Sequence, residues 1–124
     1  MFVYKQSTGT LSHNGVELGI CYSGHAAGVN NPADEKIQMV GPIPEGVYTI
    51  GSPFTHPTCG PEAMRLTPNP GTNDFGRAGF LMHGDNSELN HTASEGCIIA
   101  AKVIRTQIMA AVAAGDDQLT VTAS

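Results

Sequence analysis

A histidine and a cysteine lie fourteen positions apart in the last third of the chain, in the segments His83-Gly84-Asp85 and Ser94-Glu95-Gly96-Cys97. Cysteine hydrolases and acyltransferases hold a thiolate against an imidazole for attack on a carbonyl carbon. A glycine before the cysteine leaves backbone N–H groups free to point at the oxyanion that develops in such an attack. An isolated Cys or His is more often a packing or surface residue. The Ser-x-Gly-Cys context instead favours a reactive pair and predicts acyl transfer.

The residues of these two segments have separate expected roles. Cys97 is the candidate nucleophile, since contact with an imidazole lowers the pKa of a free thiol from about 8.5 by several units. His83 is the candidate base, which takes the thiol proton and later protonates the departing amine. The N–H groups of Gly96 and Cys97 are the candidate oxyanion hole. Ser94 either orients His83 or only forms the turn, and Gly84 is interpreted as backbone clearance beside the nucleophile.

Length and composition restrict the fold and the partners. The 124 residues suffice for one domain, residues 1–124, with a single modest core. Fifteen Gly, eight Pro and only 14% charged residues indicate a turn-rich, mainly β chain. A net charge of −5 without any Lys or Arg cluster argues against a nucleic-acid partner. No apolar run approaches the length that a bilayer requires, so no membrane partner is expected.

The amino terminus and the cysteines bear on the compartment. Met1–Gln6 lacks the basic start and apolar stretch of a signal peptide, so export would need another route. Three cysteines leave one unpaired. Either Cys21 and Cys59 form a disulfide in an oxidising compartment while Cys97 stays free, or all three are reduced. The sequence leaves both open.

The elements that must position the two reactive residues are mostly short strands separated by turns. Asn14-Gly15 is a strong hairpin signal because both positions tolerate the positive φ of a type I′ turn. Polar loops are expected at Ser23–Gln38, Ser52–Glu62 and Asn86–Ala93. Strands are expected at Phe2–Gln6, Thr10–His13, Val16–Tyr22, Val47–Ile50, Met64–Leu66, Ala78–His83, Cys97–Ala100 and Leu119–Thr122.

A single helix is expected at Lys102–Ala114, ended by Gly115. Its apolar stripe is predicted to comprise Val103, Ile104, Ile108 and Val112. The sequence therefore predicts a compact, mainly β domain with one packing α-helix, and Ala78–His83 delivers the histidine at the end of a core strand.

Two segments together resemble a known enzyme family. One is Gly41-Pro42-Ile43-Pro44-Glu45-Gly46-Val47-Tyr48-Thr49-Ile50, and the other is Phe75–Asp85 running on to Ser94–Ile99. In order and spacing they resemble the catalytic domain of L,D-transpeptidases, the YkuD-like fold. The short spacing and Ser-x-Gly-Cys-Ile are similar to the branch used as antibacterial effectors of type VI secretion. Three opening segments also resemble that branch: Gln6–Gly9, His13–Gly15 and Tyr22–Gly24.

The resemblance implies a fold and an activity. The fold would be an L,D-transpeptidase-like β-sandwich or barrel with one packing helix. The activity would be L,D-carboxypeptidase and D-amino-acid exchange on peptidoglycan tetrapeptide stems, through a Cys97 thioester and without cofactor or metal. The implied partners are the stem peptides, a cognate immunity protein and the type VI secretion apparatus. The implied site of action is the periplasm of a target bacterium, reached without a signal peptide.

The resemblance also implies substrate contacts, because stems of this kind carry a terminal carboxylate and an amine on the third residue. Arg77 is expected to hold the carboxylate by a bidentate pair, unless it forms a surface ion pair. Asp85 is expected to hold the amine, unless it only caps a turn. Tyr22 is a candidate lining residue of the cleft, whereas Tyr48 is expected to face the core. The other histidines are interpreted as solvated loop residues: His13, His25, His56 and His91.

Two positions depart from the pattern of housekeeping wall enzymes. Glu95 stands where those enzymes have His, and Ile99 stands where many have Arg. These departures argue against full 3→3 cross-linking, which needs a second stem to dock, and leave the acylation step intact.

Three alternatives remain from the residues. A papain-like peptidoglycan amidase or endopeptidase places Cys before His, and only Cys21 and Cys59 precede His83. A zinc-binding module would draw on His83, Asp85, His91 and Cys97, whose spacing is unlike common structural zinc patterns. The third alternative is a non-catalytic wall-binding module, against which the absence of Trp argues mildly.

Overall fold

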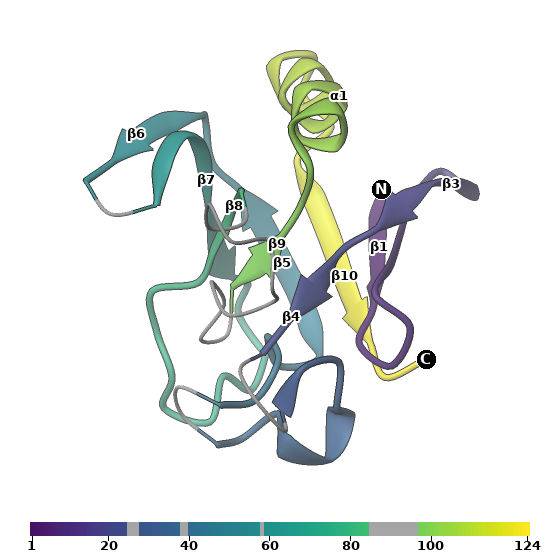
Figure 1. Cartoon of the computed structure of the whole chain (residues 1–124), viewed down its shortest axis with the longest axis vertical. Coiled ribbons are helices and arrows are strands. Elements are labelled where there is room, and N and C mark those ends of the chain that lie inside the picture. The colour runs from purple at the N-terminus through teal and green to yellow at the C-terminus, as the bar shows by residue number, and fades with distance from the viewer. Residues whose placement is uncertain (25–27, 38–39, 58, 85–96) are drawn as a thin grey trace.

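Short β-strands dominate the chain and curl into a nearly closed, barrel-like sheet with an α-helix against it (Figure 1). The computed structural model describes residues 1–24, 28–37, 40–57, 59–84 and 97–124. The expected mainly β fold with one packing helix is confirmed. The strands are β1 (Phe2–Lys5), β2 (Thr10–His13), β3 (Val16–Ile20), β4 (Tyr22–Ser23), β5 (Gly46–Ile50), β6 (Phe54–His56), β7 (Gly60–Pro68), β8 (Leu81–His83), β9 (Ile98–Ile99) and β10 (Gln118–Thr122). The helices are the 3₁₀ turn η2 (Pro32–Asp34) and α1 (Lys102–Ala113).

The order of the strands explains how the sheet closes. It runs β3-β2-β1-β10-β5-β7-β8-β9-β4, with β6 paired only to β7. β3 and β4 stand at opposite ends of this order, yet only Cys21 separates them in sequence. The single strand expected at Val16–Tyr22 is therefore divided, because its first part pairs with β2 and its last part with β9. The Cys21 N–H donates to the Gly9 carbonyl at 2.7 Å and stabilises the passage between the two.

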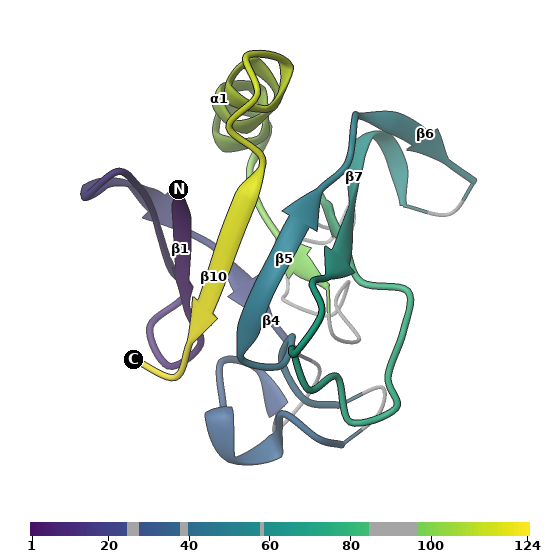
Figure 2. The same ribbon diagram turned by 180° about the vertical axis from the view of Figure 1, so that it is seen from behind.

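The two ends of the chain are tied into the middle of the sheet. β10 lies between β1, to which it is parallel, and β5, to which it is antiparallel (Figure 2). The β2–β3 hairpin turns at Asn14 and Gly15, whose φ angles of 49° and 84° confirm the predicted type I′ turn.

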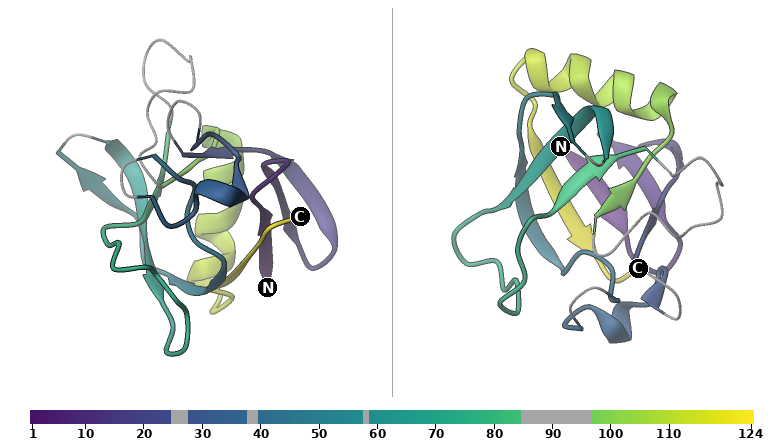
Figure 3. Two further views of the ribbon diagram at one scale, coloured as in Figure 1. Left: turned by 90° about the horizontal axis from the view of Figure 1, so that it is seen from below. Right: turned by 60° about the vertical axis from the view of Figure 1, so that its left-hand side comes forward.

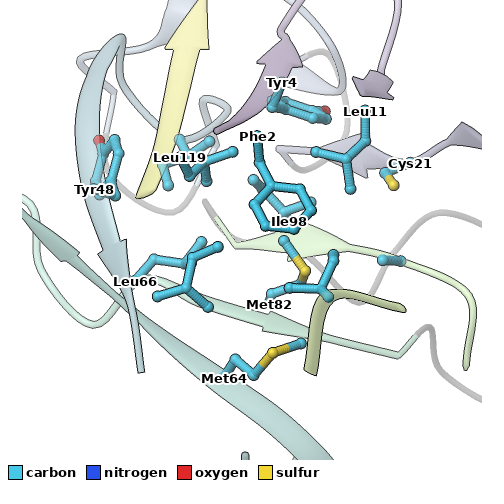
Figure 4. Close-up of a cluster of buried hydrophobic side chains, with 14 of the residues drawn as sticks. Phe2, Tyr4, Leu11, Cys21, Tyr48, Met64, Leu66, Met82, Ile98 and Leu119 are labelled. Carbon is cyan, nitrogen blue, oxygen red and sulfur yellow. The ribbon is translucent and has the colours of Figure 1, made fainter. Parts of the chain in front are cut away.

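The core lies inside the curled sheet, where alternate residues of neighbouring strands point inward (Figure 4). β1 contributes Phe2 and β10 contributes Leu119, while Met82 and Ile98 come from the adjacent strands β8 and β9. Tyr48 is fully buried and its hydroxyl donates to the Pro44 carbonyl at 2.7 Å, which confirms that it faces the core. The strands carrying the predicted reactive residues are thus held by burial of their opposite face.

α1 lies across one end of the barrel (Figure 3, right). Ile104 and Ile108 are buried in the core, and Val112 packs against it. Val103 was expected in the same stripe but is 66% exposed. One residue advances about 100° around a helix, so Val103 lies off the face that Ile104 and Ile108 bury. Gly115, with φ of 95°, ends the helix as predicted.

Two of the histidines expected in solvated loops lie in strands instead. The half-buried His13 is on β2, its ring stacked on Phe2 with centroids 4.2 Å apart and its Nε2 2.5 Å from the Asp116 carboxylate. His56 lies on β6, where Nδ1 accepts the Cys59 N–H at 3.0 Å. His25 and His91 lie outside the described residues.

No helix in the described part of the chain combines the length and apolar character needed to cross a membrane.

The contrast between two apolar residues of α1 tests this packing. Ile108→Ala is expected to lower the free energy of unfolding by about 2–5 kcal/mol, because it opens a cavity at a position that is 0% exposed. Val103→Ala, on the exposed side of the same helix, is expected to change it by about 0.5 kcal/mol or less. Urea titrations monitored by circular dichroism measure both, and similar losses for the two variants would contradict this assignment of the helix face.

Candidate active site

The parallel pairing of β8 with β9 brings the two halves of the predicted site together. Met82 pairs with Ile98 and His83 pairs with Ile99. Residues in register on neighbouring strands point to the same face, and successive residues alternate. Because Met82 and Ile98 enter the core, His83 and Ile99 point to the opposite face of the sheet.

Cys97 immediately precedes β9 and lies two residues before Ile99. It stands at a bend in the backbone that leads into the strand paired with the one carrying His83. Paired strands are about 4.8 Å apart, so the start of β9 lies close to β8. The thiol is half-buried, with Sγ 3.9 Å from the Gly79 carbonyl oxygen.

His83 is only 3% exposed, and its Nδ1 lies 2.8 Å from the carbonyl oxygen of Gly84. A carbonyl only accepts hydrogen bonds, so Nδ1 carries the proton and the neutral ring has its lone pair on Nε2. This is the tautomer that a general base requires. The Gly84 carbonyl thus orients the ring through Nδ1. No residue-type signal could have found it, because the partner is a backbone atom.

Tyr22 joins the same face from the other side. It pairs with Ile99 across β4 and β9, so Tyr22, Ile99 and His83 stand in register on three adjacent strands. Tyr22 is 5% exposed and also lines a pocket of about 550 Å³. Because the sheet closes at Cys21, the predicted cleft residue Tyr22 stands in register with the predicted base His83.

That pocket lies between β4, β9 and the start of α1. Its described lining residues are Ile20, Cys21, Tyr22, Asn30, Gly84, Ile99, Ala100, Ala101, Lys102 and Arg105. It reaches Gly84, next to His83, and Ile99, two residues after Cys97. His83 and Cys97 themselves are not among its lining residues, so the pocket adjoins the predicted pair through their neighbours in the chain.

Arg77 lies in a different setting from the one expected. It is 5% exposed, and its guanidinium donates to the carbonyls of Glu35, Pro42 (2.8 Å) and Gly41 (2.9 Å). These bonds brace the turn Gly41–Gly46 against the segment that leads to β8. Most of the guanidinium is therefore occupied by the protein itself, while its role toward a substrate carboxylate stays a prediction.

The charge of Arg77 acts on the thiol. Burial lowers the pKa of the Arg77 guanidinium, and the nearby ionisable groups of Tyr48, Cys97 and Glu35 oppose that shift. Arginine remains protonated at any physiological pH. A fixed positive charge that interacts with Cys97 favours the thiolate over the thiol.

Sequence reasoning missed Arg105, which lies on the first turns of α1 beside Gly84. A Cβ placed on Gly84 would come within 2.9 Å of the Arg105 Nη2. The backbone clearance expected at Gly84 therefore accommodates a guanidinium. An Arg on a surface helix gives no sequence signal of this kind, because only the packing of α1 against the end of β8 brings it there.

Three predicted site residues, Asp85, Ser94 and Gly96, lie outside the described residues. Their assigned roles at the amine, at the imidazole and in the oxyanion hole stay predictions.

The residues that build this site lie within the part of the chain that a protein-family model matches. A model of the Tlde1 domain matches residues 19–123 of the chain. The chain belongs to the Tlde1 family. This is a family of type VI secretion effectors of the L,D-transpeptidase type. No curated protein matches the chain. The effector family to which the sequence motifs pointed is therefore the correct one, and the Tlde1 match includes Tyr22, His83, Cys97 and Arg105.

The three cysteines of this Tlde1 chain are free thiols in very different settings. Cys21 is 4% exposed, and burial raises its pKa to about 12. Burial also raises the pKa of Cys59. A raised pKa disfavours the thiolate, so both residues that a papain-like order would need are poor nucleophiles. Among the described residues, no group of three or more His, Cys, Asp or Glu side chains is placed to hold a metal.

These settings predict an order of thiol reactivity. At pH 8, a pKa of about 12 leaves only about one Cys21 in ten thousand as thiolate, and its labelling rises with pH or on unfolding. Iodoacetamide is therefore expected to label Cys97 first, Cys59 more slowly and Cys21 only in denaturant. Peptide mass spectrometry over a labelling time course measures the order. Faster native labelling of Cys21 or Cys59 than of Cys97 would contradict it, and Cys97→Ala should remove the fast phase.

Proposed function

We propose that this Tlde1 family member is an L,D-carboxypeptidase and D-amino-acid exchange transpeptidase that acts on peptidoglycan tetrapeptide stems through a Cys97 thioester. The observation that carries the proposal is the parallel pairing of β8, which ends at His83, with β9, which Cys97 immediately precedes. The 550 Å³ pocket beside these strands supports it, because it is large enough for a peptide segment.

In the first step, the Cys97 sulfur attacks the carbonyl carbon at the L-centre of the third stem residue. His83 Nε2 takes the thiol proton, and the Nδ1–H···O=C bond to Gly84 steadies the imidazolium that forms. The Arg77 charge favours the thiolate beforehand. The N–H groups of Gly96 and Cys97 are proposed to stabilise the tetrahedral oxyanion.

Collapse of the intermediate breaks the C–N bond to the fourth residue. His83 gives its proton to the departing amine, so D-alanine leaves and the third residue stays on Cys97 as a thioester. In the second step, His83 deprotonates water or the amine of a free D-amino acid, which attacks the thioester carbonyl. Hydrolysis gives a tripeptide stem, exchange gives a stem with a new fourth residue, and both restore the thiol.

This chemistry accounts for the sequence departures from wall enzymes. A small acceptor needs no second stem-binding groove, so the changes at Glu95 and Ile99 are compatible with hydrolysis and exchange. Either outcome removes the tetrapeptide stems that cell-wall synthesis uses. As a type VI effector, the protein would act in the periplasm of a target bacterium. A cognate immunity protein that blocks the pocket would protect the producer, and the secretion apparatus would deliver the effector.

A muropeptide assay tests the proposal directly. The protein is incubated with purified tetrapeptide muropeptides, and mass spectrometry follows loss of D-alanine and incorporation of added D-methionine. Cys97→Ala and His83→Ala are each expected to lower the rate by about a thousandfold or more, because nucleophile and base act as one unit. Cys59→Ala and His56→Ala change the same residue types around the β6–β7 hairpin and should retain activity.

Three results would reject the proposal. D-alanine release that survives both site substitutions would remove Cys97 and His83 from the mechanism. Cleavage at the sugar–peptide amide would favour an amidase. Binding of muropeptides without any turnover by the native protein would favour a wall-binding module.

A further inference from the structure

Arg105 is held rigidly by the backbone of its own protein. Its Nε donates to the Ala100 carbonyl at 3.1 Å, and its Nη1 donates to the carbonyls of Pro61 at 3.1 Å and Glu62 at 3.2 Å. The side chain is only 11% exposed. Three backbone acceptors therefore fix the plane of the guanidinium before any ligand arrives, which removes most of the ordering cost of binding.

The remaining nitrogen of that guanidinium faces the pocket. Nη2 has no hydrogen-bond partner among the described residues, and it lies against the open side of Gly84. Both Gly84 and Arg105 line the 550 Å³ pocket. A side chain at position 84 would cover Nη2, so the glycine keeps this donor accessible directly beside His83.

The pocket is cationic in an acidic protein. Lys102 and Arg105 line it, and none of its described lining residues is acidic, although the whole chain carries a net charge of −5. Glu62 lies at the far side of the guanidinium, its carboxylate 4.0 Å from Nη1. A local excess of positive charge with a pre-oriented N–H donor favours an anionic ligand, and a carboxylate matches guanidinium geometry best.

We propose that Arg105 binds the free α-carboxylate of the residue on the leaving-group side of the scissile bond, assisted by Lys102. This rests on the proposed function, in which that residue is the fourth of the stem. Exchange is the reverse of D-alanine release, so the incoming D-amino acid occupies the same place and presents its carboxylate to the same guanidinium. Arg105 thereby makes the enzyme require a free carboxylate in both the substrate and the acceptor.

Arg77 is less suited to this role. Its guanidinium binds three backbone carbonyls, and Arg77 is not among the residues that line the pocket. The assignment of the substrate carboxylate therefore moves from Arg77 to Arg105.

Paired substrates test the proposal. Two tetrapeptides are compared, one ending in D-alanine and one ending in D-alaninamide, and kcat/KM for release of the fourth residue is measured by mass spectrometry. The native protein is expected to prefer the acid by about ten- to a hundredfold, the value of a charge-assisted hydrogen-bond pair. Arg105→Gln should bring the ratio close to one, chiefly by raising KM for the acid. Arg105→Lys should retain an intermediate preference, because lysine keeps the positive charge but lacks the planar, paired N–H donors of a guanidinium.

The ratio protects the test against loss of folded protein, since both substrates see the same fraction of active enzyme. Arg65→Gln is the matched control, because Arg65 is an exposed arginine that stacks on Phe54 and does not line this pocket. It should keep the native ratio. An unchanged ratio in Arg105→Gln, or native protein that does not distinguish acid from amide, would overturn the proposal.

A binding experiment separates this inference from the proposed function. In Cys97→Ala protein, N-acetyl-D-alanine should saturably shift the amide NMR signals of Gly84 and Ala101, whereas N-acetyl-D-alaninamide should not. The additional change Arg105→Gln should abolish the shifts. If native protein releases no D-alanine, the catalytic proposal fails and this binding result alone decides. Equal shifts with acid and amide, or none with the acid, would refute the carboxylate site.

Discussion

The pairing of β8 with β9 is the contact on which the candidate site depends. Both strands are short, and each has one residue buried in the core, Met82 and Ile98. Burial of an apolar side chain stabilises by about 1.5–3 kcal/mol, so these two residues contribute more to holding the strands than two ladder hydrogen bonds would. Because alternate residues of a strand point to opposite faces, the same burial turns His83 away from the core, while Cys97 lies immediately before the neighbouring strand. A slip of one residue would send the histidine into the core and Met82 into the site.

Backbone carbonyls hold two arginines near the site, Arg77, which is buried, and Arg105, which is half-buried. A guanidinium offers five N–H donors, and loops and helix ends leave carbonyls that need donors. Arg77 satisfies carbonyls of the 35–42 segment, and Arg105 satisfies those at the end of β9 and the start of β7. The two arginines differ in what the guanidinium group acts on besides these carbonyls. Arg77 sits where its charge acts on the Cys97 thiol, whereas Arg105 keeps one donor open to a pocket.

Closure of the sheet brings Tyr22 to the site. A chain segment that leaves one end of the strand order at Ile20 and enters the other end at Tyr22 must cross the opening of the barrel. Tyr22 then reaches Ile99 and stands in line with His83. Curvature of the sheet, which no local pattern encodes, is thus what makes an N-terminal tyrosine part of a C-terminal site.

The sequence by itself determined the mainly β class, the hairpin at Asn14-Gly15, the end of the helix at Gly115 and the family, because these depend on local backbone preferences and on motifs of adjacent residues. It also singled out His83 and Cys97, since their residue types and flanking glycines carry chemistry. Only the tertiary structure decided which atom orients His83, that Val103 faces solvent, that His13 stacks in a strand, and that Arg105 opens onto the pocket. Each of these is a contact between segments distant in sequence, and such contacts depend on how the sheet curls and where the helix packs.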